Sequence, residues 1–193
     1  MKSEANVKLS PEERELVQNT EWILTKQRII DKVITMFSAL ADDYSYRIQD
    51  AGKNEWCIPE AKISKGERYE QLPYVMLDFP RKFDKENVFA VRTFFWWGNY
   101  FSINLLVSGY YLEEYRHVLL SEKFSGWFIS VKEDPWDHRF SAENFIERNN
   151  IDSELLKNKS FIKLAKKIPL SEWDEAYALL LNHFETIVRN LVS

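Results

Sequence analysis

Arg92 is the charged residue whose position in this sequence points most directly to chemistry. It lies within residues 88–107, where most neighbours are apolar or aromatic. A guanidinium in such surroundings must be paired, because an unpaired buried charge is very costly. Asp78, in the preceding apolar run, is the expected partner. If no protein acid reaches it, Arg92 could instead hold the carboxylate or phosphate of a ligand.

A second polar cluster occupies residues 133–139, with the sequence EDPWDHR. Loops of this kind at strand ends often carry functional sites on a rigid scaffold. Asp134, Asp137 and His138 could bind a divalent metal ion through carboxylate and imidazole donors, although their spacing matches no established metal motif. The other interpretation is a structured turn in which Trp136 fills a gap in the core.

The remaining nucleophiles and bases form no catalytic pattern. The sequence has three histidines and one cysteine, Cys57, which has no neighbouring histidine or basic residue to activate it. A nucleophile elbow, a glycine-rich phosphate loop and a dinucleotide fingerprint are all missing from the sequence. We therefore predict no cofactor, and leave open whether the protein is an enzyme.

The residues around Arg92 are expected to form a β-hairpin, with strands 88–97 and 100–107. A two-residue Gly98-Asn99 turn of type II′ would set the register, so that Trp97 faces Tyr100. One face is then apolar except for Arg92, and the other is mixed. The apolar face holds Val88, Ala90, Phe94, Trp96, Phe101, Ile103, Leu105 and Val107, and the mixed face holds Phe89, Val91, Thr93, Phe95, Trp97, Tyr100, Ser102, Asn104 and Leu106.

An aromatic wall with a few polar groups describes a ligand groove, but also a sheet face covered by a helix or a partner chain. The candidate ligand-binding residues of this sheet are Arg92, Asp78, Phe95, Trp97, Tyr100, Ser102 and Asn104.

Helices are expected on both sides of the sheet in the sequence. Ser10, Pro11 and Glu13 form a helix start with a capping box, and a seven-residue apolar repeat then runs from Leu16 to Tyr44. A continuous helix over 11–49 would be about 58 Å long, against a radius of gyration of about 16 Å for a compact chain of this size. We therefore expect a break at Asn19-Thr20; without one, the repeat would suit a partner helix in a homodimer.

The other elements follow from shorter patterns. Strands are expected at 73–79, closed by Pro80, and at 127–132, with 56–62 ambiguous and a turn at Lys65-Gly66-Glu67. Helices are expected at 110–123, 141–149, 152–159 and from Ser171 to the C-terminus, while 161–168 fits either type. The lysines at 157, 159, 163, 166 and 167 are expected to form a solvated basic face, or else to touch phosphates.

Together these elements predict an α+β fold, in which an antiparallel sheet of about four to five strands packs with an N-terminal long helix or helix pair and a C-terminal helical block. We expect a disordered tail over 1–9 and a single domain over 10–193. With 193 residues, 45% of them hydrophobic and 15% aromatic, the chain can bury a full core. The net charge of −4 argues mildly against nucleic-acid binding.

The longest apolar run is too short to span a membrane, and a lone cysteine suits a reducing compartment, so the protein is expected to be soluble and cytoplasmic. The leading hypothesis is a non-enzymatic binding or interaction protein that takes a protein partner or a small anionic or aromatic ligand. The alternative is a hydrolase or a metal-assisted phosphate enzyme that joins Arg92 and Asp78 to the loop of Asp134 and His138. That enzyme would require the loop to lie within about 10 Å of the hairpin.

Overall fold

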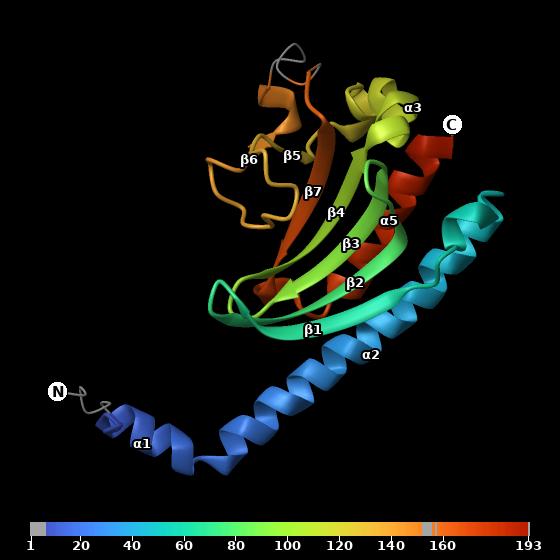
Figure 1. Ribbon diagram of the computed structural model, residues 1–193. Coiled ribbons are helices and arrows are strands. Elements are labelled where there is room, and N and C mark those ends of the chain that lie inside the picture. The colour runs from blue at the N-terminus through green and yellow to red at the C-terminus, as the bar shows by residue number, and fades with distance from the viewer. Residues whose placement is uncertain (1–6, 152–155, 157, 193) are drawn as a thin grey trace.

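A computed structural model describes residues 7–151, 156 and 158–192 of the chain. Its centre is a curved, antiparallel sheet of seven strands in the order β1-β2-β3-β4-β7-β5-β6 (Figure 1). This is the expected α+β architecture, with more strands than predicted. The strands are β1 (Lys62–Tyr69), β2 (Leu72–Phe83), β3 (Val88–Trp96), β4 (Tyr100–Ser108), β5 (Phe128–Ser130), β6 (Phe145–Glu147) and β7 (Phe161–Pro169).

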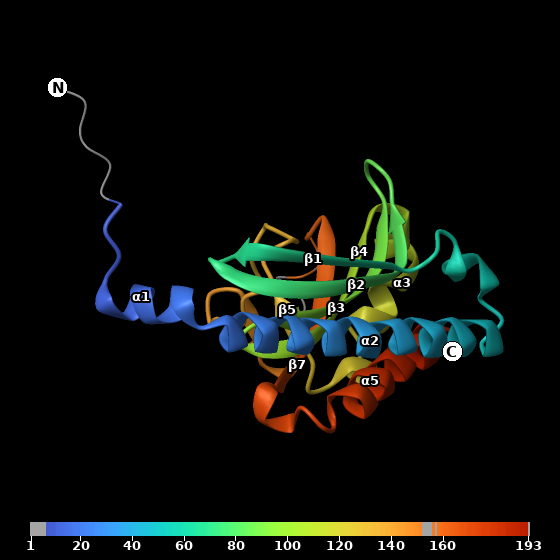
Figure 2. The same ribbon diagram turned by 90° about the horizontal axis from the view of Figure 1, so that it is seen from below.

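The described helices lie on one side of the sheet, and an irregular loop between β5 and β6 lies on the other (Figures 1 and 2). α2 packs against β2 and α5, α5 packs against β4, and α3 packs against β7. The α-helices are α1 (Pro11–Gln18), α2 (Thr20–Asp50), α3 (Gly109–Leu119) and α5 (Ala176–Val192); short 3-10 turns cover Asn54–Cys57, Glu122–Phe124, Arg148–Asn150 and Leu170–Glu172.

The predicted break in the N-terminal helix is confirmed at Asn19. Its side chain accepts from the backbone N–H of Trp22 and so caps α2, while its own N–H donates to Leu16 at the end of α1. The predicted capping box between Ser10 and Glu13 is also present. From Ile30 onward α2 buries one stripe against the sheet, and its last buried residue is Ile48. The N-terminal end of the apolar repeat, from Leu16 to Ile23, stays exposed.

The predicted register of the hairpin is wrong by one residue. The last pair is Trp96 with Tyr100, and Asn104 lies opposite Arg92. The loop therefore has three residues, because the N–H of Trp97 donates to Pro73 of the neighbouring strand instead of closing a two-residue turn. Gly98 adopts φ 70°, which glycine reaches without strain.

Because of this one-residue shift, the predicted assignment of residues to the two sheet faces is reversed for β3 and correct for β4. The helix-covered face holds Phe89, Val91, Thr93, Phe95, Phe101, Ile103, Leu105 and Val107, and all except Thr93 belong to the main core. The opposite face holds Val88, Ala90, Arg92, Phe94, Trp96, Tyr100, Ser102, Asn104, Leu106 and Ser108. Arg92 is therefore not stranded on an apolar face, because Ser102 and Asn104 lie on the same face.

Two predictions around β1 and β2 are wrong. Gly66 lies inside β1, and a Cβ there would come within 2.5 Å of the Tyr74 ring, so it serves close packing rather than a turn. The turn falls at Glu70-Gln71, both at positive φ, which the sequence did not indicate because such residues rarely adopt that conformation. Pro80 does not end β2, since a bulge between Asp78 and Arg81 accommodates it.

The C-terminal half also differs from the predicted pattern. Residues 141–149 do not form a helix; they complete a loop and enter β6. Residues 161–169 form a full-length strand that pairs with β4 along its whole length. The helix expected over 152–159 falls largely outside the described residues, as does most of the tail expected over 1–9. The last helix, expected from Ser171, begins at Ala176, and its buried residues include Leu180, Phe184, Ile187, Val188 and Leu191.

Candidate functional site

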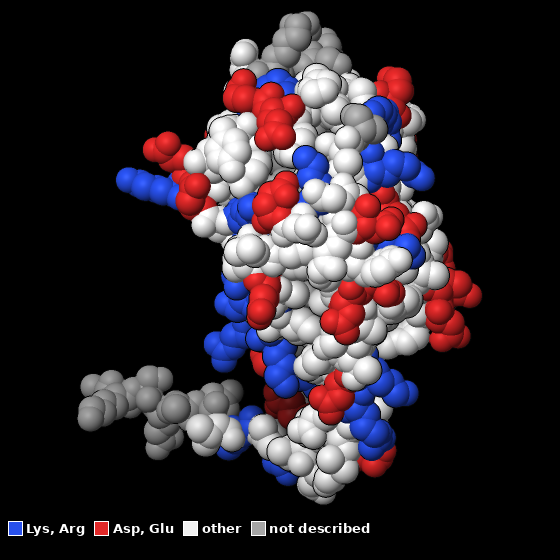
Figure 3. All heavy atoms as spheres, turned by 90° about the vertical axis from the view of Figure 1, so that its right-hand side faces the viewer, with Lys and Arg blue, Asp and Glu red and all other residues white. Residues whose placement is uncertain are grey.

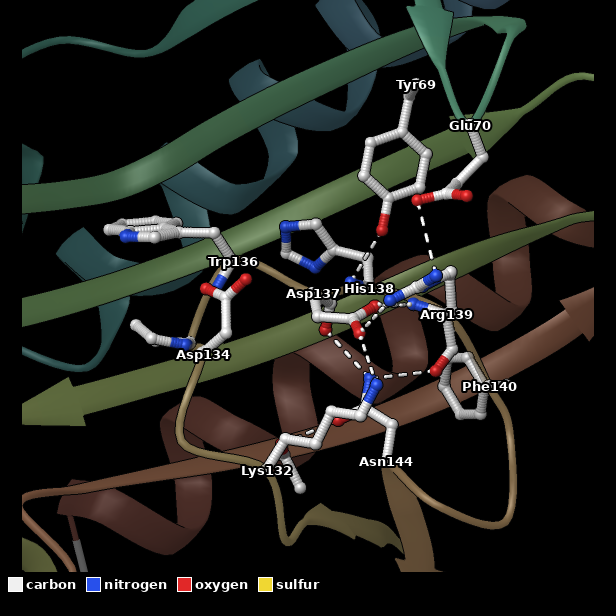
Figure 4. Close-up of polar contacts among 12 residues, drawn as sticks. Tyr69, Glu70, Lys132, Asp134, Trp136, Asp137, His138, Arg139, Phe140 and Asn144 are labelled. Atoms are coloured by element: carbon white, nitrogen blue, oxygen red, sulfur yellow. Dashed lines mark hydrogen bonds and ion pairs between the residues drawn. The ribbon is translucent and has the colours of Figure 1, made fainter.

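The loop of residues 131–144 lies over the sheet face that carries Arg92 and is held there by side chains from several elements. The hydroxyl of Tyr100 donates to the carbonyl of His138 (3.0 Å) and accepts from the N–H of Phe140 (3.1 Å). The hydroxyl of Tyr69 accepts from the N–H of His138 at 2.7 Å (Figure 4). Asn144, buried at the end of the loop, donates to the carbonyls of Asp137 and Arg139. The loop is therefore a fixed wall over the sheet.

Beneath this loop a chain of polar side chains crosses the sheet from β2 to β7. Arg92 makes two parallel hydrogen bonds to Asp78, from Nε at 2.7 Å and from Nη2 at 3.0 Å, so the expected ion pair is present. Nη1 of Arg92 lies 3.1 Å from Nε2 of His138. The other ring nitrogen of His138, Nδ1, lies 3.0 Å from Nζ of Lys163.

Lys163 is fully buried, with 0% of its surface exposed. Its Nζ donates to the carbonyls of Pro135 (3.0 Å) and Asp137 (2.7 Å) on either side of Trp136. The lysine therefore satisfies two loop carbonyls that would otherwise be buried without donors. The expectation that Lys163 belongs to a solvated basic face is wrong, because β7 points this residue under the loop.

The hydrogen bonds along this chain determine where the protons lie. Arginine has no acceptor and keeps its proton, so Nε2 of His138 must accept from Arg92. A neutral imidazole that accepts at Nε2 carries its proton on Nδ1, which must then donate to Nζ of Lys163. An ammonium group has no lone pair, so the pattern is complete only when Lys163 is a neutral amine.

The electrostatic surroundings favour the same neutral states. Burial, followed by the positive charge of Arg92, lowers the pKa of Lys163 to about 7. Burial also holds the pKa of His138 well below its usual value, with Lys163 and Arg92 acting in the same direction. Above a pH of about 7, where Lys163 is mainly neutral, only Asp78 and Arg92 are thus formally charged in the chain from β2 to β7, and their charges compensate each other.

A small cavity lies between this polar chain and the ring of Trp136. Its volume is about 10 Å³, near the lower limit for a single water molecule. Arg92, Asn104, His138 and Lys163 contribute to its wall. Trp136 closes the outer side: its ring centroid lies 5.2 Å from Cζ of Arg92 and 5.9 Å from the Phe83 ring, and 45% of its surface is exposed.

Asn104, which contributes to the wall of this cavity, has an unsatisfied acceptor. It is 1% exposed, and its Nδ2 donates to Oγ of Ser102 (3.1 Å) and to the carbonyl of Arg92 (3.4 Å). These two bonds fix the orientation of the amide, because its oxygen could not face the Arg92 carbonyl. Within the described part of the chain, the buried Oδ1 has no donor, which costs about 1–3 kcal/mol unless another molecule supplies one.

Asp137 occupies a separate cluster at the loop's outer edge. Arg139 Nη2 donates to its Oδ2 at 2.7 Å and Lys132 Nζ at 3.1 Å (Figure 4). The Arg139 side chain above all holds the pKa of Asp137 well below its usual value. Asp134 accepts from the N–H of Trp136 at 2.8 Å.

The structure thus brings together some of the predicted site residues and separates others. Arg92, Asp78, Ser102, Asn104 and His138 surround one site, and Tyr100 anchors its loop. Phe95 lies on the opposite face, edge-on to Trp173, and Trp97 lies in the hairpin loop. Asp134, Asp137 and His138 do not converge as metal donors; across residues 7–151, 156 and 158–192 no three His, Cys, Asp or Glu side chains do.

Sequence reasoning missed Lys163, Trp136 as the cavity's outer wall, and Tyr69. One indication for Lys163 was available in the sequence. In a strand, Lys163 shares a face with Phe161 and Ala165, which lie two residues before and after it, and such an apolar face is expected to be buried.

Comparison with known proteins adds no assignment. No protein-family model, no curated protein and no solved structure matches this chain. Among the described residues, no helix combines the length and the apolar character needed to cross a membrane. The function must therefore be argued from the geometry of the site.

Proposed function

We propose that this protein is a non-enzymatic binding protein that holds a small hydroxycarboxylic acid beneath Trp136. The observation that carries the proposal is the buried, unsatisfied Oδ1 of Asn104, a residue that lines the same cavity as Arg92. A ligand that fits must donate a hydrogen bond to Asn104 and accept one from the guanidinium. A hydroxyl next to a carboxylate supplies both.

The guanidinium has donors left for such a ligand. Three of its five N–H groups serve Asp78 and His138, which leaves two for an acceptor in the cavity. The bidentate pair with Asp78 holds the guanidinium in place, so a ligand would meet a preorganised donor. Since the cavity has room for about one water, the ligand must displace the ring of Trp136, whose exposed position allows it to turn outward.

The test is a thermal-shift titration with glycolate and lactate, compared with acetate and propionate, which lack the hydroxyl. We expect the hydroxy acids to stabilise the protein more, approaching about 2.7 kcal/mol at a hundred times the dissociation constant. Asn104→Ala should remove the difference between glycolate and acetate. Asn150→Ala, at an exposed position, is the matched control and should behave as wild type.

Two results would contradict the proposal. One is the failure of all four acids to shift the melting temperature of the wild-type protein, which would mean that a lone water satisfies Asn104. The other is equal discrimination by the Asn104→Ala variant, which would place the binding elsewhere.

The enzyme alternative is a hydrolase or metal-assisted phosphate enzyme built on Arg92, Asp78 and the 134–138 loop. Its required proximity is met, because His138 lies 3.1 Å from Arg92. The loop carboxylates, however, face away from the cavity toward Lys132, Arg139 and the backbone of Trp136. The arrangement therefore favours binding over catalysis. The cytoplasm stays the proposed compartment, on the sequence argument from the single cysteine, and nucleic acid is not a proposed partner.

A further inference from the structure

The N-terminal arm, which we define as α1 together with the first turns of α2, carries a large unpartnered apolar surface. α1 lies beyond the sheet, and the start of α2 splays away from β1 (Figures 1 and 2). Three consecutive residues of α2, Trp22, Ile23 and Leu24, are 45%, 46% and 44% exposed. Since consecutive residues point in different directions around a helix, these three apolar side chains spread over about half of its circumference.

A groove opens in the angle between the arm and the edge strand β1. It has a volume of about 400 Å³, and its walls are formed by Ile23, Lys26, Gln27, Ile30, Asp31, Lys65 and Glu67, with an ion pair between Lys26 and Glu67. β1 pairs on one side only, with β2. The groove therefore combines the exposed Ile23 and several charged side chains with a strand edge that pairs with no other described strand, and such an edge favours pairing with another segment.

The arm cannot fill this groove in its own molecule. α1 and α2 are joined by a single residue, Asn19, which ends one helix and caps the next. Two helices that fold back on each other need a connection of about 2–5 residues. A copy of α1 that covers the groove must therefore come from another molecule.

The charges of the arm and of the strand edge are complementary. α1 carries Glu12, Glu13 and Glu15 against one base, Arg14. β1 carries Lys62, Lys65 and Arg68 against one acid, Glu67. Elsewhere, on the face over α2 and α5, acidic and basic side chains are interspersed (Figure 3). α1 thus has an excess of negative charge and β1 an excess of positive charge. Because both lie on one chain, a second copy of this protein is the favoured occupant of the groove.

We infer that α1 of one copy docks in the groove between α2 and β1 of a second copy, and that the second copy does the same in return. Leu16 and Val17, both exposed on α1, would cover the exposed Ile23 of the partner, and the acids of α1 would face Lys62 and Lys65. This reciprocal exchange uses one surface twice, as twofold symmetry requires. It is independent of the ligand site beneath Trp136.

The inference is tested by light scattering and analytical ultracentrifugation of the full chain. The protein should dimerise between about 1 and about 100 µM, the range of a weak to moderate association. Glu12→Lys/Glu15→Lys should weaken the dimer by about tenfold or more, and so should Lys62→Glu/Lys65→Glu. The four substitutions combined in one chain should restore it, which a simple loss of helix α1 could not do.

Glu143→Lys/Glu147→Lys makes the same charge change at exposed positions near β6 and should leave the dimer intact. The inference is overturned by a monomer at the highest concentration, by arm variants that behave like this control, or by a combined variant that stays as weak as either pair.

Discussion

The two faces of the central sheet are both buried, but by different kinds of structure and with different side chains. In β3 and β4, the face under α2 and α5 is apolar apart from Thr93, whose hydroxyl lies 3.1 Å from that of Tyr44. The face under the 131–144 loop contains Arg92, Asn104 and Lys163 beside Phe94 and other aromatic residues. Both faces are buried, but only the second carries a polar network.

The difference follows from what covers each face. The backbone N–H and C=O groups of a helix are hydrogen-bonded to each other, so a helix needs only apolar contacts with the sheet. An irregular loop brings carbonyls that need donors, and Lys163 supplies them to Pro135 and Asp137. Polar side chains are therefore buried on the loop-covered face. An acceptor without a donor, such as Asn104 Oδ1, is available there to bind a ligand.

The largest effect that separates the faces is expected from Phe37→Ala. Phe37 is fully buried on α2 and contacts Phe101 edge-on. The substitution should lower the free energy of unfolding by about 4 kcal/mol, because it leaves an apolar cavity that neighbours cannot fill. Denaturant unfolding measures this. Phe140→Ala, at a half-buried position of the loop, is the comparison and should cost less; an equal cost would mean that the loop packs as tightly as the helices.

A somewhat smaller effect is expected from Arg92→Met on the loop-covered face. The substitution leaves the carboxylate of Asp78 buried without its partner, and should cost about 3 kcal/mol. The double variant Arg92→Met/Asp78→Leu should recover most of this loss, since well-packed apolar residues can replace a buried ion pair. If the double variant is no more stable than the single one, the ion pair stabilises the fold by more than the neutralisation of two buried charges.

The smallest of the three effects is a change in pH dependence on Lys163→Met. In the folded protein, burial lowers the pKa of Lys163 from its ordinary value of 10.5 to about 7. Between these values the unfolded chain binds a proton that the folded chain does not, so the stability contributed by this group rises with pH above 7. The slope approaches about 1.4 kcal/mol per pH unit, or about 2 kcal/mol between pH 7 and 9.

Denaturant unfolding at several pH values checks this prediction, and Lys163→Met should remove that rise. Lys167→Met, on the same strand at a partly exposed position, should keep it. A rise that persists unchanged in Lys163→Met would show that the buried amine is charged in the folded protein.

Local rules were sufficient for several features of the fold. The helix start at Ser10, the break at Asn19 and the need of Arg92 for Asp78 each depend on neighbouring residues or on the cost of a buried charge. The hairpin was also located correctly, but its register was not. One hydrogen bond, from Trp97 to Pro73 of a third strand, changes the loop length. Arg92 therefore shares a face with Ser102 and Asn104 and not with Phe101 and Ile103, as predicted.

The candidate site was predicted in part, for a related reason. Arg92, Asp78, Asn104, Ser102 and His138 were singled out, but on two separate surfaces. That His138 reaches Arg92 depends on how the 131–144 loop crosses the sheet, which no local pattern specifies. Lys163 was missed because five nearby lysines resemble a solvated face until the strand is known to lie under the loop.

The sequence by itself determined which segments are helical at the N-terminus, where the aromatic hairpin lies, and that a charge within it must be paired. These follow from local propensity, capping and the energetics of burial, which operate over a few residues. Only the tertiary structure decided which face of the hairpin is polar, how a buried lysine and histidine share their protons, and which end of the long helix stays exposed. Those outcomes depend on contacts between residues far apart in the chain, and a shift of one residue reverses every side chain of a strand.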